Sequence, residues 1–95
     1  MKSRKAKQIS QVLQKKGFRL DPSKQHHDFY YLVINDKKQS VYTYLSHGAK
    51  DYGNSLMLMI KKQLKFKDNQ MAEDFFDCPL SAEGYINRLI KNGDL

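Results

Sequence analysis

The spacing of apolar residues predicts an amphipathic helix at the start of the chain, from Ser3 to Lys16. Its apolar residues recur at helical intervals: Ala6, Ile9, Val12 and Leu13. Ser3 is a suitable N-cap, and Gly17 suits the left-handed residue that ends many helices. The opposite side carries Arg4, Lys7, Gln11 and Lys15. We therefore expect a helix whose exposed side is cationic.

Three strands are predicted next. A short one covers residues 18–20 and stops before Pro22, and two longer ones cover 27–34 and 40–46, which are rich in aromatic and β-branched residues. The polar residues 35–38 between the longer strands suit a hairpin turn. Alternation places Phe29, Tyr31 and Val33 on one face, opposite Asp28, Tyr30, Leu32 and Ile34; it also separates Val41, Thr43 and Leu45 from Tyr42 and Tyr44. Helices should cover one face, and the other should be rich in tyrosine.

The second half of the chain reads as helical. After a loop at residues 47–54, a helix begins at Asn54 or Ser55 and runs to Phe66, with a buried stripe of Leu56, Met59, Ile60 and Leu64. Asn69 begins a short helix, and Ser81 opens a last one that ends near Asn92. The prediction is an α+β fold of order α-β-β-β-α with a three-stranded antiparallel sheet plus C-terminal helices. Residues 1–67 form the core, and 68–95 form an acidic helical extension packed on the same domain.

Charge separates these two parts. Residues 1–24 hold eight Lys or Arg and one Asp, whereas residues 68–95 hold two basic and six acidic residues, within a total net charge of +7. A basic surface attracts polyanions, and RNA is an abundant one. The lone Cys78 excludes an internal disulfide, which favours a reducing compartment. Neither a signal peptide nor a membrane span is predicted, so we expect a cytoplasmic protein.

Histidines are the main candidates for chemistry. His26 and His27 stand side by side at the start of a strand, and His47 lies in a glycine-containing loop. Imidazole serves as both acid and base near neutral pH. These three histidines and Cys78 form no zinc-ligand spacing, so neither a metal nor another cofactor is expected. Seven cations are candidate phosphate contacts: Lys2, Arg4, Lys5, Lys7, Lys15, Lys16 and Lys50.

Three segments resemble the HicA family of bacterial toxin–antitoxin modules. KSRKAKQISQVLQKKGFRL is similar to the family's first helix and first strand, HHDFYYL to its paired histidines followed by an aromatic, and SVYTYLSHGAKDYGNSLMLMIKKQLKF to its third strand, basic loop and second helix. The resemblance implies a double-stranded-RNA-binding-domain-like fold, metal-independent cleavage of messenger RNA and an antitoxin partner. Two places depart from the family pattern. Lys24-Gln25 stands where Gly-Ser is usual, and Leu45-Ser46-His47-Gly48 replaces a Pro-His-Pro-like element.

The resemblance identifies His26 as the general acid–base residue and His27 as its neighbour, with Lys24 and His47 as possible supporting groups. Side chains alternate along a strand, so one of the paired histidines is expected to be structural. Two other functions remain open: a non-catalytic RNA-binding or regulatory domain, and a protein-interaction module that binds an acidic partner. Tyr30, Tyr42 and Tyr44 either stack unpaired bases or lie beneath the extension, and we favour the second.

Overall fold

The computed structural model describes residues 1–23, 27–46, 48, 50–77 and 79–95. It contains an α+β fold, as predicted, with these elements in chain order: β1 (Arg4–Lys5), α1 (Ala6–Lys15), β2 (Phe18–Asp21), β3 (His27–Ile34), β4 (Lys37–Ser46), β5 (Asp51–Tyr52), α2 (Asn54–Gln63), α3 (Asn69–Asp77) and α4 (Ala82–Lys91). Within the described residues, no helix has both the length and the apolar character needed to cross a membrane.

The main sheet is antiparallel, with the strand order β2-β3-β4. Its hairpin turns on Asn35 and Asp36, whose φ angles are 51° and 62°. Positive φ at both central residues is typical of the tight turn that matches strand twist, and Asn and Asp tolerate it better than most residues. Because the turn needs only two residues, β4 begins at Lys37, three positions before the predicted strand.

A second, two-stranded sheet was not predicted. β1 pairs with β5, so that Arg4 lies opposite Tyr52 and Lys5 opposite Asp51. This pairing holds the backbone of Arg4 and Lys5 extended, and α1 consequently begins at Ala6 rather than near Ser3. The prediction of Ser3 as the N-cap is therefore wrong, because Lys5 occupies that position without a capping side chain. The end of the helix is as predicted, with Gly17 at φ 98°.

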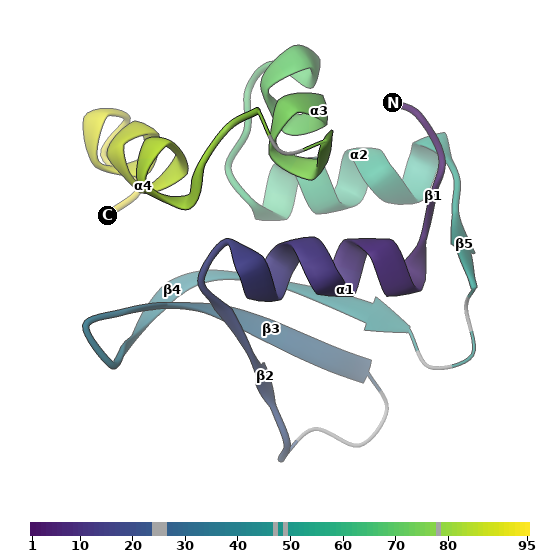
Figure 1. Ribbon diagram of the computed structural model, residues 1–95, viewed down its shortest axis with the longest axis horizontal. Coiled ribbons are helices and arrows are strands. Elements are labelled where there is room, and N and C mark those ends of the chain that lie inside the picture. The colour runs from purple at the N-terminus through teal and green to yellow at the C-terminus, as the bar shows by residue number, and fades with distance from the viewer. Residues whose placement is uncertain (24–26, 47, 49, 78) are drawn as a thin grey trace.

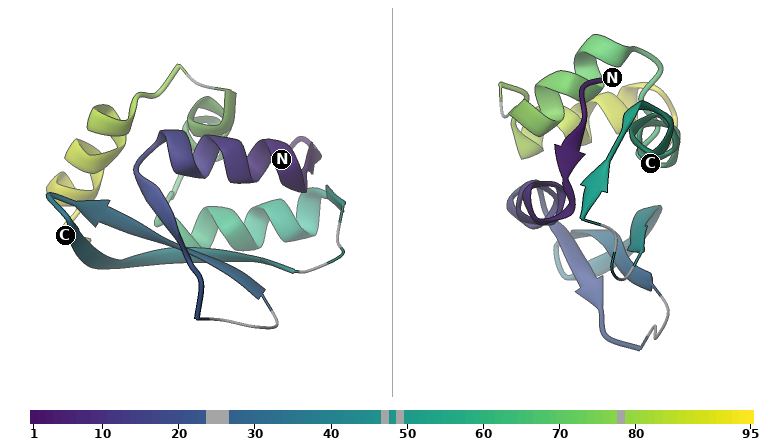
Figure 2. Two further views of the ribbon diagram at one scale, coloured as in Figure 1. Left: turned by 60° about the horizontal axis from the view of Figure 1, so that its bottom comes forward. Right: turned by 90° about the vertical axis from the view of Figure 1, so that its right-hand side faces the viewer.

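The elements form three layers (Figures 1 and 2). The main sheet lies on one side, α1 and α2 cover one of its faces, and α3 and α4 lie beyond those helices. The core between the sheet and the helices contains Ile9, Leu13, Leu32, Val41, Met57, Ile60 and Leu64, all fully buried. Ile60 and Leu64 are buried in the α2 region as predicted, but the prediction of Leu56 as buried is wrong, because Met57 is buried in its place and Leu56 is 41% exposed.

The C-terminal helices complete a second cluster of aromatic side chains. The ring of Tyr85 on α4 lies 4.9 Å from that of Phe75 on α3 and 5.2 Å from that of Phe66, while Phe18 lies 6.0 Å from Tyr85. The Tyr85 hydroxyl donates to the carbonyl oxygen of Leu64 at 2.9 Å, and its burial raises the pKa of this phenol above the ordinary value. The expectation that the extension covers the tyrosine-rich sheet face is thus wrong.

Candidate nucleic-acid-binding groove

A groove lies where the first half of α1 meets the ends of β3 and β4. Its lining combines hydroxyl, carboxylate and ammonium groups with a few apolar side chains, and consists of Ala6, Lys7, Ser10, Asp28, Tyr30, Leu45, Ser46 and Gly48. Most of these residues belong to a helix and two paired strands, which hold side chains more firmly than loops do. The groove is therefore a preformed polar depression beside a cationic helix.

The floor of the groove is fixed by one hydrogen bond between α1 and β3 and by a second within α1. The hydroxyls of Ser10 and Tyr30 lie 2.7 Å apart, and the Gln14 side-chain amide donates to Ser10 Oγ at 3.1 Å. Tyr30 is only 4% exposed. Tyr30 faces α1, on the sheet face opposite Tyr42 and Tyr44. The interpretation of Tyr30 as a base-stacking residue is therefore wrong.

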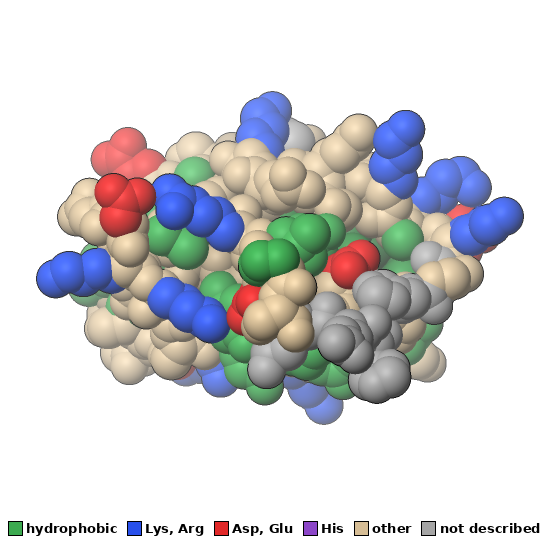
Figure 3. Space-filling view, turned by 90° about the horizontal axis from the view of Figure 1, so that it is seen from below, with side chains coloured by type: hydrophobic (Ala, Val, Ile, Leu, Met, Phe, Trp, Pro, Cys, Tyr) green, Lys and Arg blue, Asp and Glu red, His purple; other side chains and the backbone are tan. Residues whose placement is uncertain are grey.

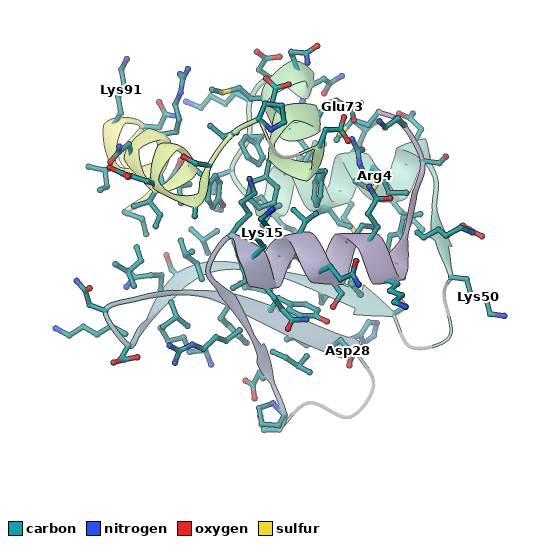
Figure 4. All side chains as sticks on the ribbon, in the orientation of Figure 1. Arg4, Lys15, Asp28, Lys50, Glu73 and Lys91 are labelled. Atoms are coloured by element: carbon teal, nitrogen blue, oxygen red, sulfur yellow. The ribbon has the colours of Figure 1, made fainter. Side chains whose placement is uncertain are left out.

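One lysine lines the groove, and three other exposed lysines lie on α1, on β1 and in the segment after β4. Lys7 forms part of its wall, and Lys15 is exposed two turns further along α1. Lys5 is also exposed and pairs with Asp51 at 3.3 Å. Lys50 is exposed in its side chain, while its carbonyl oxygen accepts the Ala6 N–H at 2.8 Å. That bond fastens the segment after β4 to the start of α1, and Figure 4 shows Lys15 and Lys50 toward opposite ends of the helix.

Arg4 is not part of this exposed set. Its side chain is 1% exposed, and its guanidinium donates to Glu73 at 2.9 Å and to Asp77 at 3.0 Å, both on α3. It also lies 5.2 Å from the ring centroid of Phe76. The predicted exposure of Arg4 is therefore wrong, because α3 packs over β1 and presents two carboxylates to it (Figure 4).

The same acidic helix engages Lys2, whose ammonium lies 3.2 Å from Asp77. Partial burial alone would raise the pKa of Asp77, but hydrogen bonds from Arg4 and Lys2 outweigh it and hold that pKa below its ordinary 3.8. Lys2 keeps a side chain that is 59% exposed. The acidic extension thus neutralises part of the basic N-terminal segment from within the same chain.

Lys16 is also withdrawn from the surface. It is 3% exposed, its ammonium donates to the carbonyl oxygen of Leu80, and it lies 5.7 Å from the ring centroid of Phe75. A buried ammonium loses its hydrogen bonds to water, so it needs partners of this kind to replace them. Lys16 therefore fastens α1 to the segment between α3 and α4, and a phosphate contact by this residue is not supported.

Of the predicted histidine and lysine centre, only His27 can be placed. His26, Lys24 and His47 lie outside the described residues. His27 begins β3 and is partly exposed, with its ring 5.1 Å from that of Tyr44 and 6.2 Å from that of Phe29. Its side chain belongs to the sheet face opposite the groove. Within the described residues, no group of three or more His, Cys, Asp or Glu side chains is arranged to bind a metal ion.

The alternation in the sequence also pointed to a feature that the site prediction missed. Phe29 and Tyr31 join Tyr42 and Tyr44 on the sheet face that the helices leave uncovered.

A comparison of the chain with known protein families, curated proteins and solved structures found no match.

Proposed function

We propose that this protein binds RNA in the groove between α1 and the ends of β3 and β4. The observation that carries the proposal is exposed Lys7 in the wall of a depression built mostly on a helix and two paired strands, with Lys15 exposed further along the same helix. Lysines contact the phosphate backbone, and hydroxyls such as that of Ser10 suit hydrogen bonding to phosphate and ribose. The net charge of +7 supports the same class of ligand.

The proposal extends to cleavage, on the strength of the resemblance to HicA toxins. RNA carries its own nucleophile, the ribose 2′-OH. A base removes the 2′-OH proton, the oxygen attacks the adjacent phosphorus, and an acid protonates the leaving 5′ oxygen. His26 is the proposed general acid–base residue, and Lys24 is proposed to stabilise the charge that develops on the phosphate. The reaction needs no metal ion.

The remaining expectations belong to the same proposal. The order of α1, β2, β3, β4 and α2 suits a double-stranded-RNA-binding-domain-like core. The protein acts in the cytoplasm of a bacterium, and an antitoxin protein restrains it. His47, which lies outside the described residues, is proposed from the sequence alone as a supporting acid–base group or phosphate contact.

The test is incubation of the purified full chain with end-labelled RNA in a chelator, beside His26→Ala, Lys7→Ala and Lys91→Ala. Lys91 is an exposed lysine on α4, far from the groove in Figure 4, and serves as the matched charge control. We expect cleavage that His26→Ala abolishes. Lys7→Ala should weaken binding and lower the slope of log affinity against log salt by about one, whereas Lys91→Ala should leave that slope unchanged.

Other outcomes separate the alternatives. Binding with no cleavage by the unaltered chain supports a non-catalytic RNA-binding domain and refutes the role of His26. Absence of binding at low salt refutes RNA as the ligand. One observation favours a second candidate in that case: Arg4 and Lys2 already bind carboxylates of α3. A protein-interaction module for an acidic partner would use the same kind of contact.

A further inference from the structure

The sheet face opposite the helices carries a continuous cluster of rings, here called the aromatic face: His27, Phe29 and Tyr31 on β3, and Tyr42 and Tyr44 on β4. Register brings the rings together, because Phe29 lies opposite Tyr44 and Tyr31 opposite Tyr42. The ring centroids of these two pairs are 5.2 Å and 5.5 Å apart. Phe29 also stacks with Tyr42 at 6.0 Å.

These rings are accessible. Tyr42 is 41% exposed, and the other four are partly exposed. All four helices lie on the far side of the sheet (Figures 1 and 2), although the Tyr44 hydroxyl reaches Met59 Sδ on α2 at 4.0 Å. Contiguous apolar surface is uncommon on a solvent-facing sheet, and where it occurs it usually marks a binding site. These strands therefore expose aromatic side chains to solvent at positions where polar side chains would be better solvated.

Cations border the aromatic face at the hairpin end. The Lys38 ammonium lies 3.7 Å from the ring centroid of Tyr31, and Arg19, which pairs with Asp36, remains 66% exposed. A cleft at this edge is lined in part by Arg19, Asp21, Tyr31 and Lys38. The view from the sheet side shows Lys and Arg side chains projecting mostly around the margins, with hydrophobic side chains nearer the middle (Figure 3).

The other end of the aromatic face adjoins the groove. His27 on the aromatic face is the register partner of Ser46, which lines the groove, and the next pair along is Asp28 with Leu45, which also line it. The groove and the aromatic face thus lie on opposite faces of the sheet and meet at the same end of β3 and β4. A flat apolar surface with cations at its hairpin end complements a ligand that carries both planar rings and negative charge.

We propose that the aromatic face stacks unpaired bases, so that the substrate class of this protein is single-stranded RNA. This inference rests on the proposed function and adds a second contact surface to the groove. From His27 to Tyr31 the face spans about 13 Å, which is room for two or three stacked bases. Bases in a duplex already stack on one another and cannot lie on these rings. Stacking is tolerant of sequence, since every base has a flat face.

The experiment measures affinity by fluorescence anisotropy for a single strand and a hairpin duplex of equal length, both in uncleavable 2′-O-methyl form. The variants are Tyr42→Leu, Tyr42→Phe, the groove variant Lys7→Ala, and Leu56→Ala as a control with the same 41% exposure on α2. Tyr42→Leu should weaken single-strand binding about 5- to 20-fold and change duplex binding less than about twofold. Tyr42→Phe keeps the ring and should bind normally, as should Leu56→Ala.

The two proposals fail in different ways. If the chain binds RNA and Lys7→Ala weakens it, yet Tyr42→Leu binds the single strand normally, the aromatic face plays no part and the groove proposal stands. Equal affinity for single strand and duplex also overturns the inference. If the chain is a dimer by light scattering and Tyr42→Leu makes it monomeric, the face is a self-association surface instead. Absence of binding to either RNA overturns both proposals.

Discussion

Replacing Arg4 by alanine should destabilise the fold by about 2–3 kcal/mol. The change removes three hydrogen bonds: one to Glu73, one to Asp77 and one to the carbonyl oxygen of Lys2 at 3.1 Å. Charge-assisted hydrogen bonds contribute about 1.5–3 kcal/mol each. The total is reduced, because the side chains of Glu73 and Asp77 are 22% and 37% exposed and water replaces part of what they lose. The alanine variant also no longer has to bury a guanidinium whose Nε lacks a hydrogen-bond partner, and this lowers the net loss of stability further.

Urea unfolding at pH 7, followed by far-ultraviolet circular dichroism, measures this change. In a chain of 95 residues it corresponds to a melting temperature lower by roughly 10–20 °C. The matched control is Lys5→Ala, the neighbouring residue of β1. Lys5 also forms an ion pair, but its side chain is 77% exposed, so its loss should cost less than about 1 kcal/mol.

A loss below about 1 kcal/mol for Arg4→Ala, or equal losses for the two variants, would refute the argument that burial sets the strength of this contact. Arg4→Ala also tests the assignment of roles among the N-terminal cations. At a temperature where the variant is fully folded, its affinity for RNA should match that of the unaltered chain, because the guanidinium faces α3 and not the solvent.

Three further changes test single contacts. The pKa of Asp77 is depressed in the folded state, so the ionised carboxylate stabilises the fold fully above about pH 5, and this stabilisation is lost as pH falls through the folded pKa. The difference in unfolding free energy between the unaltered chain and Asp77→Asn, measured by urea titration, should therefore shrink below about pH 4. A difference that stays constant with pH would contradict this. Gly17→Ala should cost about 1–2 kcal/mol by the same assay because φ there is 98°, whereas no loss would mean that the backbone relaxes. Ser81→Ala should cost about 1 kcal/mol, since Ser81 Oγ accepts the Gly84 N–H at 3.0 Å as the cap of α4; an unchanged melting curve would show that the cap contributes nothing.

Local patterns predicted the regular elements. The strand expected at residues 27–34 is β3 to the residue, and the cap and end of the last helix are where Ser81 and Asn92 placed them. Alternation and helical periodicity are properties of neighbouring residues, so one segment suffices to read them. The β1–β5 pair joins Arg4 and Lys5 to Tyr52 and Asp51, which are distant in the sequence. No periodicity signals so short a pairing.

The site was less predictable, because exposure depends on what packs over a residue. Arg4 and Lys16 are indistinguishable from Lys7 and Lys15 in the sequence, yet α3 and the segment around Leu80 bury the first two. The same limit applies to the aromatic face. Alternation separated the two faces within each strand, but which face of β3 joins Tyr42 and Tyr44 depends on the register, and the tight turn at Asn35 sets it.

The aromatic cluster around Phe18 also constrains how the chain acquires its structure during synthesis. Phe18 emerges from the ribosome before Phe75 and Tyr85, whose rings pack against it. Until residues 69–91 are free, a nascent chain holds Phe18 and Phe66 without their cover, and such transient apolar patches favour aggregation. The docking of α4, which brings Tyr85 against both rings, is accordingly the step that completes their burial.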